Sequence, residues 1–129
     1  IIVAITEGDQ LHELIHACRE FELDALVECY GEEDLNRVDF SLVDILGVNN
    51  RDLRNFDVDL HRGVELLNRA PEGTVLVSES GLSKPADLQL LAQNNIQAAL
   101  IGEYFMKNED PGRAVSDLIE GTKQKLENV

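Results

Sequence analysis

The sequence predicts an α/β protein with about five parallel β-strands alternating with helices, as in part of a (β/α)8 TIM barrel or in an open doubly wound sheet. Two observations support this fold class. Short apolar runs recur along the chain, and each is followed by a segment whose apolar residues have helical spacing. Near-continuous apolar strands that alternate with helices are typical of a parallel sheet covered by helices. Such a sheet is either open and doubly wound or part of a barrel.

The expected strands are rich in Val, Ile and Leu and occupy residues 1–5, 25–29, 43–48, 74–78 and 98–102. Helical faces follow them. After the first run, the shared face consists of Leu11, Leu14, Ile15 and Cys18. After the fourth run, Leu88 and Leu91 share a face, and Pro85 suits the first turn of that helix. A last helix begins near Pro111 and carries Ala114, Val115, Leu118 and Ile119 on one side.

Residues 1–129 are expected to form a single incomplete barrel domain, because this length allows one domain at most. The chain begins in mid-strand and without Met, so we expect further sequence before Ile1. Five strands cannot close an eight-stranded barrel. The domain should therefore present two open sheet edges and an exposed, apolar barrel-interior surface.

The net charge of −14, with only 11 Lys and Arg, argues against nucleic acid and anionic membranes as partners. It also suits an anionic ligand poorly, although backbone N–H groups can bind phosphate without charged side chains. No apolar run is long enough to span a membrane. Cys18 and Cys29 have neither metal nor disulfide spacing, which favours a reduced, cytoplasmic location.

Polar or small residues follow four of the expected strands, at the strand ends where parallel α/β folds bind ligands. They are Glu28, Asn49, Asn50, Arg51, Glu79, Ser80, Gly81, Gly102 and Glu103. Such residues are also common turn formers, so each one alone is compatible with an ordinary loop. Together they form the candidate site.

Strand alternation places Glu28 on the same face as Leu26, with Val27 and Cys29 toward the helices. A carboxylate inside a barrel mouth can act as a general base. The alternative is a solvated loop glutamate, one of 25 acidic residues.

Asn49 and Arg51 can orient hydroxyl groups or a carboxylate of a small ligand. Glu79 can accept a ligand hydroxyl or pair with Arg51, and a plain loop ion pair is the alternative. Ser80-Gly81 and Gly102-Glu103 are small-residue turns of the kind from which barrels build phosphate sites. Two ordinary turns explain the same spacing.

Other conspicuous residues receive structural interpretations. His12 and His16 are four residues apart but lack a third metal ligand, so they fit a helix surface. Both cysteines are expected to be buried as small apolar groups. The acidic run 31–34 fits the first turn of a helix, where the helix dipole favours negative charge.

Residues 46–53 (Leu-Gly-Val-Asn-Asn-Arg-Asp-Leu) resemble the sixth-strand segment of indole-3-glycerol-phosphate synthases. Residues 77–82 look like that family's seventh-strand motif, and residues 100–106 like its eighth. Residues 26–28 and 1–5 resemble its fifth and fourth strands. The resemblance covers essentially all 129 residues and identifies the chain as the C-terminal half of the family's barrel.

The resemblance implies a carboxy-lyase of tryptophan biosynthesis that closes the indole ring of 1-(2-carboxyphenylamino)-1-deoxyribulose 5-phosphate, with no cofactor and no metal. It implies that Glu28 is a base and that Asn49 holds the substrate, with Arg51 as a supporting charge. It also implies that Glu79 and Ser80 contact the sugar-like chain. The phosphate would lie against backbone N–H groups of Gly81, Gly102 and Glu103.

Two departures from the family pattern bear on the site. Cys29-Tyr30-Gly31 stands where the family usually has a Val-His-Asp-like tripeptide, and Tyr104-Phe105 replaces Ser-Leu beside the phosphate turn. The resemblance also puts the family's catalytic lysines on strands upstream of Ile1. We therefore expect the chain alone to be inactive and to associate with the missing N-terminal half or with itself.

Two alternatives remain. One is a different phosphate-binding barrel, of the phosphoribosyl isomerase or tryptophan synthase alpha type, although the run 49–53 argues against it. The other is a non-catalytic half-barrel that associates with itself to bury its open edges.

Overall fold

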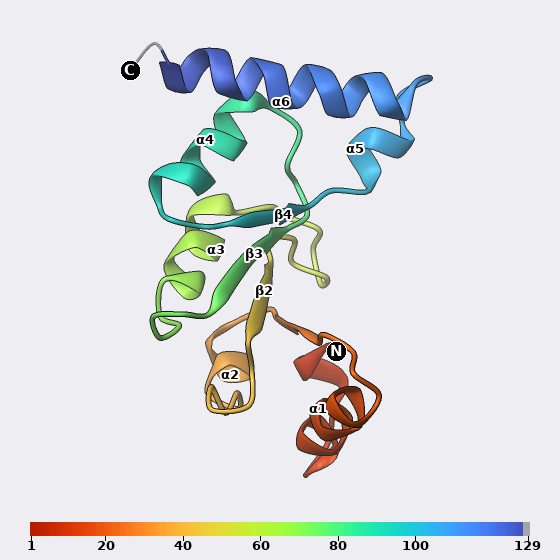
Figure 1. Cartoon of the computed structure of the whole chain (residues 1–129), viewed down its shortest axis with the longest axis vertical. Coiled ribbons are helices and arrows are strands. Elements are labelled where there is room, and N and C mark those ends of the chain that lie inside the picture. Colours follow the sequence, from red (N-terminus) through yellow and green to blue (C-terminus); the bar gives the residue numbers. More distant parts are fainter. Residues whose placement is uncertain (128–129) are drawn as a thin grey trace.

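The computed structural model describes residues 1–127 and places four parallel strands in one sheet, in the order β1-β2-β3-β4 (Figure 1). The strands are β1 (Leu26–Cys29), β2 (Ile45–Asn49), β3 (Val75–Glu79) and β4 (Ala98–Leu100). A helix lies between each strand and the next along the chain. Neighbouring order, parallel direction and helical crossovers are those of a segment of a (β/α)8 barrel, which confirms the predicted fold class.

The helices are α1 (Gln10–Glu20), α2 (Glu32–Leu35), α3 (Leu60–Leu67), α4 (Pro85–Gln93), α5 (Glu103–Met106) and α6 (Pro111–Glu127). Their starting points follow local chemistry. Asp59 caps α3 by accepting a hydrogen bond from the Arg62 N–H at 3.0 Å, and Pro85 occupies the first turn of α4 as predicted. Among the described residues, no helix is both long and apolar enough to cross a membrane.

The prediction of a strand at residues 1–5 is wrong. Only Ile1 and Ile2 run beside β1, through a single bridge from Ile2 to Glu28, and Val3–Ile5 form a 3₁₀ helix (η1). Beyond Ile2 no strand pairing occurs among the described residues, and the Ile5 and Thr6 N–H groups donate to the carbonyls of Ile2 and Val3 at 3.3 and 3.0 Å instead. Arg37 stabilises this turn by donating to the carbonyl oxygens of Val3 and Thr6 at 2.8 and 2.6 Å.

The hydrophobic core lies between one face of the sheet and the helices. Side chains alternate along each strand, and the buried set on the helix-facing side consists of Val27, Cys29, Leu46, Val48 and Leu76. Leu11 and Ile15 of α1 and Val64 and Leu67 of α3 complete the core. Burial of Val27 and Cys29 confirms that Glu28 points to the opposite face.

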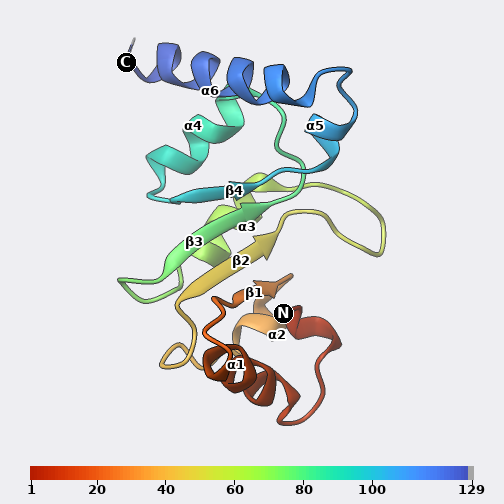
Figure 2. The same ribbon diagram turned by 45° about the vertical axis from the view of Figure 1, so that its right-hand side comes forward.

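That opposite face is the interior of the barrel segment, and it retains exposed apolar side chains. Leu100 is 54% exposed and Val75 is 41% exposed. All three residues of β4 are exposed, and within the described chain β4 pairs only with β3. Figure 2 shows β4 at one side of the sheet, with α4 and α6 beyond it and α1 at the opposite end of the molecule. One of the two expected open edges, that of β4, and the apolar interior are therefore present, whereas Ile1 and Ile2 run beside β1 at the other edge.

Candidate active site

Three polar side chains meet on the barrel-interior face, near the carboxyl ends of β1, β2 and β3. The strand register sets Glu28 opposite Gly47, and Asn49 opposite Glu79. The Asn49 side-chain amide donates a hydrogen bond to Glu28 Oε1 at 3.2 Å. Glu28 is half-buried within a strand, so it is not a solvated loop glutamate.

Glu79 is the buried carboxyl of this group, with only 3% of its surface exposed. Burial raises the pKa of Glu79 to about 8, and the neighbouring charge of Glu28, which also hydrogen-bonds to it, adds to this rise. Glu79 thus favours its protonated form near neutral pH. Raised carboxyl pKa values of this kind are frequent at sites of acid–base chemistry.

Arg51 does not pair with Glu79, the ion pair considered from the sequence. Its Nη2 instead lies 2.7 Å from Glu103 Oε2, and Lys107 Nζ lies 2.6 Å from Glu103 Oε1. The hydrogen bond and charge of Lys107, followed by the charge of Arg51, hold the pKa of Glu103 below its usual value. The Glu103 carboxylate therefore pairs with two positively charged side chains near the carboxyl end of the sheet.

A cavity of about 690 Å³ opens between the ends of β3 and β4. It brings together six residues that the sequence analysis selected: Arg51, Glu79, Ser80, Gly81, Gly102 and Glu103. Glu28 and Asn49 lie outside its lining, on the adjoining strands. Tyr104, one of the departures from the family pattern, also lines the cavity, with its ring 5.5 Å from that of Phe105.

The turn after β3 has an unusual backbone. Ser80 has a φ of 69° and Gly81 a φ of 73°, a left-handed conformation that costs a non-glycine residue energy. A Cβ at Gly81 would overlap Val58 of the β2–α3 loop, so glycine is required there for space as well as conformation. This turn faces the cavity.

Asn50 holds the Ser80 turn, although the sequence analysis gave it no individual role. The fully buried side chain donates from Nδ2 to Ser78 Oγ at 2.8 Å and to the Ser80 carbonyl at 3.1 Å. Its backbone N–H donates to the Glu79 carbonyl at 2.8 Å. The period-two alternation of β2 could have revealed this residue, because Val48 faces the helices and Asn50 follows two positions later.

Arg62 of α3 was also missed, and it ties β1 to β2. Its guanidinium donates to the Tyr30 carbonyl at 2.6 Å and to the Asn49 carbonyl at 3.0 Å. It also lies 4.6 Å from the centre of the Tyr30 ring. Burial and a hydrogen bond with Asp52 raise the pKa of Tyr30. Tyr30, which departs from the family pattern, therefore contacts the same Arg62 side chain that binds the Asn49 carbonyl.

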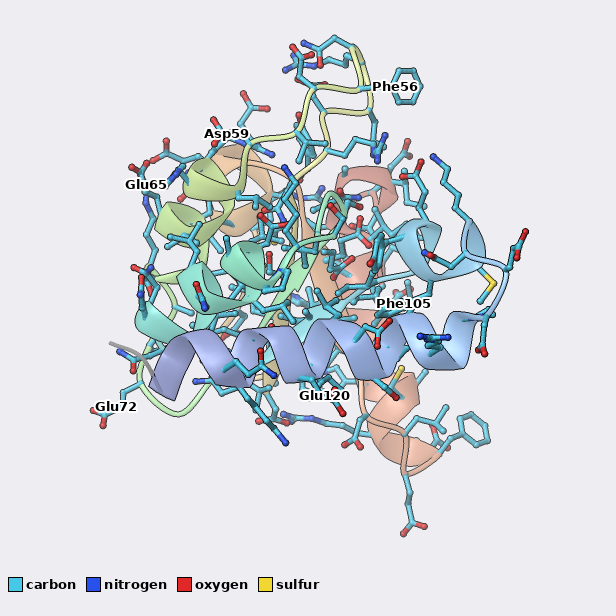
Figure 3. The ribbon with its side chains drawn as sticks, turned by 90° about the horizontal axis from the view of Figure 1, so that it is seen from above. Phe56, Asp59, Glu65, Glu72, Phe105 and Glu120 are labelled. Atoms are coloured by element: carbon cyan, nitrogen blue, oxygen red, sulfur yellow. The ribbon has the colours of Figure 1, made fainter. Side chains whose placement is uncertain are left out.

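The β2–α3 loop carries Phe56 at its tip, where it points away from the body of the molecule (Figure 3). His12 and His16 lie on α1, away from the site. Cys29 is buried and Cys18 half-buried, so the structural interpretation of the cysteines is confirmed for Cys29 only. No cluster of three metal-binding side chains occurs among the described residues.

Parallel strands with helical crossovers, and a cavity at the carboxyl ends of the last two strands, are the architecture of a segment of a (β/α)8 barrel. Comparison with known proteins agrees. The chain shares its fold, with a TM-score of 0.62 and 14% identity, with a chain in the crystal structure of the Amycolatopsis orientalis BexX/CysO complex. The match covers 87% of this chain and 46% of that one.

The family model for indole-3-glycerol phosphate synthase matches residues 1–118. The indole-3-glycerol phosphate synthase of Salinibacter ruber is 44% identical over 124 residues, which are 95% of this chain and 46% of the relative. That of Polynucleobacter asymbioticus is 41% identical over 118 residues, 92% of this chain and 44% of the relative. The chain belongs to the indole-3-glycerol phosphate synthase family, and it spans less than half the length of these relatives.

Proposed function

We propose that this chain supplies the base-bearing and phosphate-binding part of an indole-3-glycerol-phosphate synthase active site. The complete enzyme is a carboxy-lyase that closes the indole ring of 1-(2-carboxyphenylamino)-1-deoxyribulose 5-phosphate with loss of carbon dioxide and water. The observation that carries the proposal is the meeting of Glu28, Asn49 and Glu79 on one face, beside the cavity between β3 and β4. Family membership supports the choice of reaction.

Glu28 acts as the base during dehydration in this proposal. Its carboxylate accepts a hydrogen bond from Asn49, which orients the oxygen and leaves Asn49 placed to hold the substrate near its reacting centre. Arg51 provides a supporting positive charge at the mouth. A positioned base of this kind contributes about 10²- to 10⁴-fold to a rate.

Glu79 and Ser80 contact the hydroxyl groups of the sugar-like chain, and the substrate phosphate lies between the Gly81 and Gly102 turns. All four residues line the same cavity. The Glu103 side chain is engaged by Arg51 and Lys107, so Glu103 contributes its backbone N–H. The phosphate would have to compete with this carboxylate for the Arg51 and Lys107 side chains. The site is therefore expected to rely on backbone N–H donors.

The chemistry proposed here uses no cofactor and no metal, and a cytoplasmic location accords with two cysteines that are free in the structure. The chain alone is expected to be inactive. Activity requires the complementary part of the barrel, which would pair with the open edge of β4 and cover Val75 and Leu100.

Turnover of the carboxyphenylamino-deoxyribulose phosphate, followed by indole fluorescence, tests the proposal. The chain is assayed alone and after mixing with the part of the Salinibacter ruber relative that lies outside the match. Activity only in the mixture is the expected result. An assembled but silent mixture that binds another sugar phosphate would favour a different phosphate-binding barrel, and a stable dimer of this chain with no phosphate binding would favour a self-associating half-barrel.

A further inference from the structure

Gly47 occupies the position between the two carboxyl-bearing strands. Glu28 on β1 lies directly opposite Gly47 on β2, and Glu79 on β3 lies one side-chain layer further along. Neighbouring strands are about 4.8 Å apart, so β1 and β3 lie about twice that distance from each other. Their side chains can meet only by crossing the interior face of β2.

The Glu79 carboxyl group lies across this gap. A Cβ built on Gly47 would overlap Glu79 Oε1 and would lie 3.1 Å from Glu79 Cδ. Any other residue at position 47 would therefore displace the carboxyl group from its place beside Glu28. A glycine weakens a strand interior, and its usual reason there is the close approach of another group.

The contact between the two carboxyl groups requires a proton. Among the described residues, no N–H or hydroxyl group donates to the buried Glu79 Oε1. This oxygen lies over Gly47, the residue directly opposite Glu28, and the nearby Glu28 carboxyl group contributes to the raised pKa of Glu79. Two ionised carboxylates repel each other, whereas one protonated and one ionised carboxyl group form a strong hydrogen bond.

We infer that Gly47 is a positioning residue, which lets the carboxyl groups of Glu28 and Glu79 meet across β2 and share one proton. The proton belongs to the pair rather than to either carboxyl group alone. It holds an acidic and a basic oxygen at one place, as acid–base chemistry requires. This catalytic meaning rests on the proposed function, but the sharing of the proton does not.

The surroundings of the pair allow this sharing. Leu100 on β4, opposite Glu79, is apolar, and the Asn49 amide on β2 is neutral. The cationic side chain of Arg51 lines the cavity with Glu79 but is paired with Glu103 instead. Burial is the largest cause of the raised pKa of Glu79, and the charge of Glu28 is the next.

Carbon-13 NMR of the chain labelled at its glutamate carboxyl carbons tests the inference without substrate. Spectra are recorded across the pH range from about 4 to 9, and Glu79→Gln assigns the resonance. We expect Glu79 to titrate near pH 8, and its midpoint to fall by about one unit or more in Gly47→Ala, because the added methyl group separates the pair. The matched control Gly112→Ala, on α6 where only an ordinary contact lies near, should leave the midpoint unchanged.

Glu28→Gln provides a second test that keeps Gly47 in place, and it carries the inference if Gly47→Ala does not fold. Loss of the neighbouring negative charge should also lower the midpoint of Glu79. The inference is overturned if Glu79 titrates like an exposed glutamate, if a folded Gly47→Ala leaves the midpoint of Glu79 unchanged, or if Glu28→Gln does not move it. If both substitutions lower the midpoint of Glu79 as expected but the reconstituted enzyme is inactive, the proposed function is rejected and this inference stands.

Discussion

At the scale of single residues, the buried Glu79 carboxyl links the site to the stability of the fold. The pKa of Glu79 is raised by burial from 4.5 to about 8 in the folded chain, while the unfolded chain keeps the ordinary value. Between these values the folded state holds a proton that the unfolded state has released. The contribution of Glu79 to stability is therefore greatest below about pH 4.5 and is lost as the pH rises toward 8.

We predict that Glu79→Gln removes this loss. The free energy of unfolding of the unmodified chain should fall, relative to the variant, by up to about 1.4 kcal/mol per pH unit between about pH 5 and pH 8. Urea unfolding at both pH values measures the difference. Glu65→Gln on the outer side of α3, where the side chain points away from the molecule (Figure 3), is the control. Equal pH slopes for the unmodified chain and Glu79→Gln would contradict the prediction.

Residue-level prediction from the sequence succeeded where alternation alone determines the result. Glu28 was placed on the interior face because Val27 and Cys29 had to face the helices, and both are buried. The partner of Arg51 was not predictable in this way. Glu103 is 52 residues further along the chain, and the choice between Glu79 and Glu103 depends on the depth of burial, which spacing does not encode.

At the scale of elements, Asn50 joins β2, β3 and α3. It bonds to Ser78 and Ser80 at the end of β3 and accepts a backbone hydrogen bond from Asp59, the cap of α3, at 3.0 Å. A Cβ at Gly63 of α3 would overlap Asn50 Oδ1, so the helix packs closely on this amide. The Asn50 side-chain amide holds the left-handed Ser80 turn beside the cavity through its hydrogen bonds to Ser78 and Ser80.

We predict that Asn50→Ala destabilises the chain by about 1–3 kcal/mol, because it leaves the buried Ser78 hydroxyl and the Ser80 carbonyl without their donor. Denaturant unfolding measures the loss. Asn36→Ala, at the exposed end of α2, is the matched control and should cost far less. A loss for Asn50→Ala no greater than that of the control would show that the amide does not hold the turn.

Where a strand begins and ends depends more on which backbone it pairs with than on how apolar its sequence is. Residues 25–29, 74–78 and 98–102 were predicted as strands from apolar runs, and the observed strands begin within one residue of these bounds. Residues 1–5 have the same composition, yet residues 3–5 are helical because only Ile1 and Ile2 run beside a neighbour. A strand needs a partner that lies far away in sequence, and local pattern cannot supply this information.

At the scale of the whole molecule, the chain presents one side of a barrel with its interior open. Leu100, Val75 and the edge of β4 are exposed, whereas the polar group around Glu28 and the cavity near Gly102 are already formed. The two features accord with our proposal that the chain binds part of the substrate and needs a complementary surface for turnover.

The central claim, that this chain carries the base of a synthase active site, is tested most directly by Glu28→Gln in the reconstituted enzyme. With the carboxyphenylamino-deoxyribulose phosphate as substrate, we predict that kcat falls by about 10²-fold or more while KM changes little, because a general base acts in the transition state. Glu65→Gln should keep the original kcat. A Glu28→Gln enzyme that assembles and turns over as fast as this control would contradict the account.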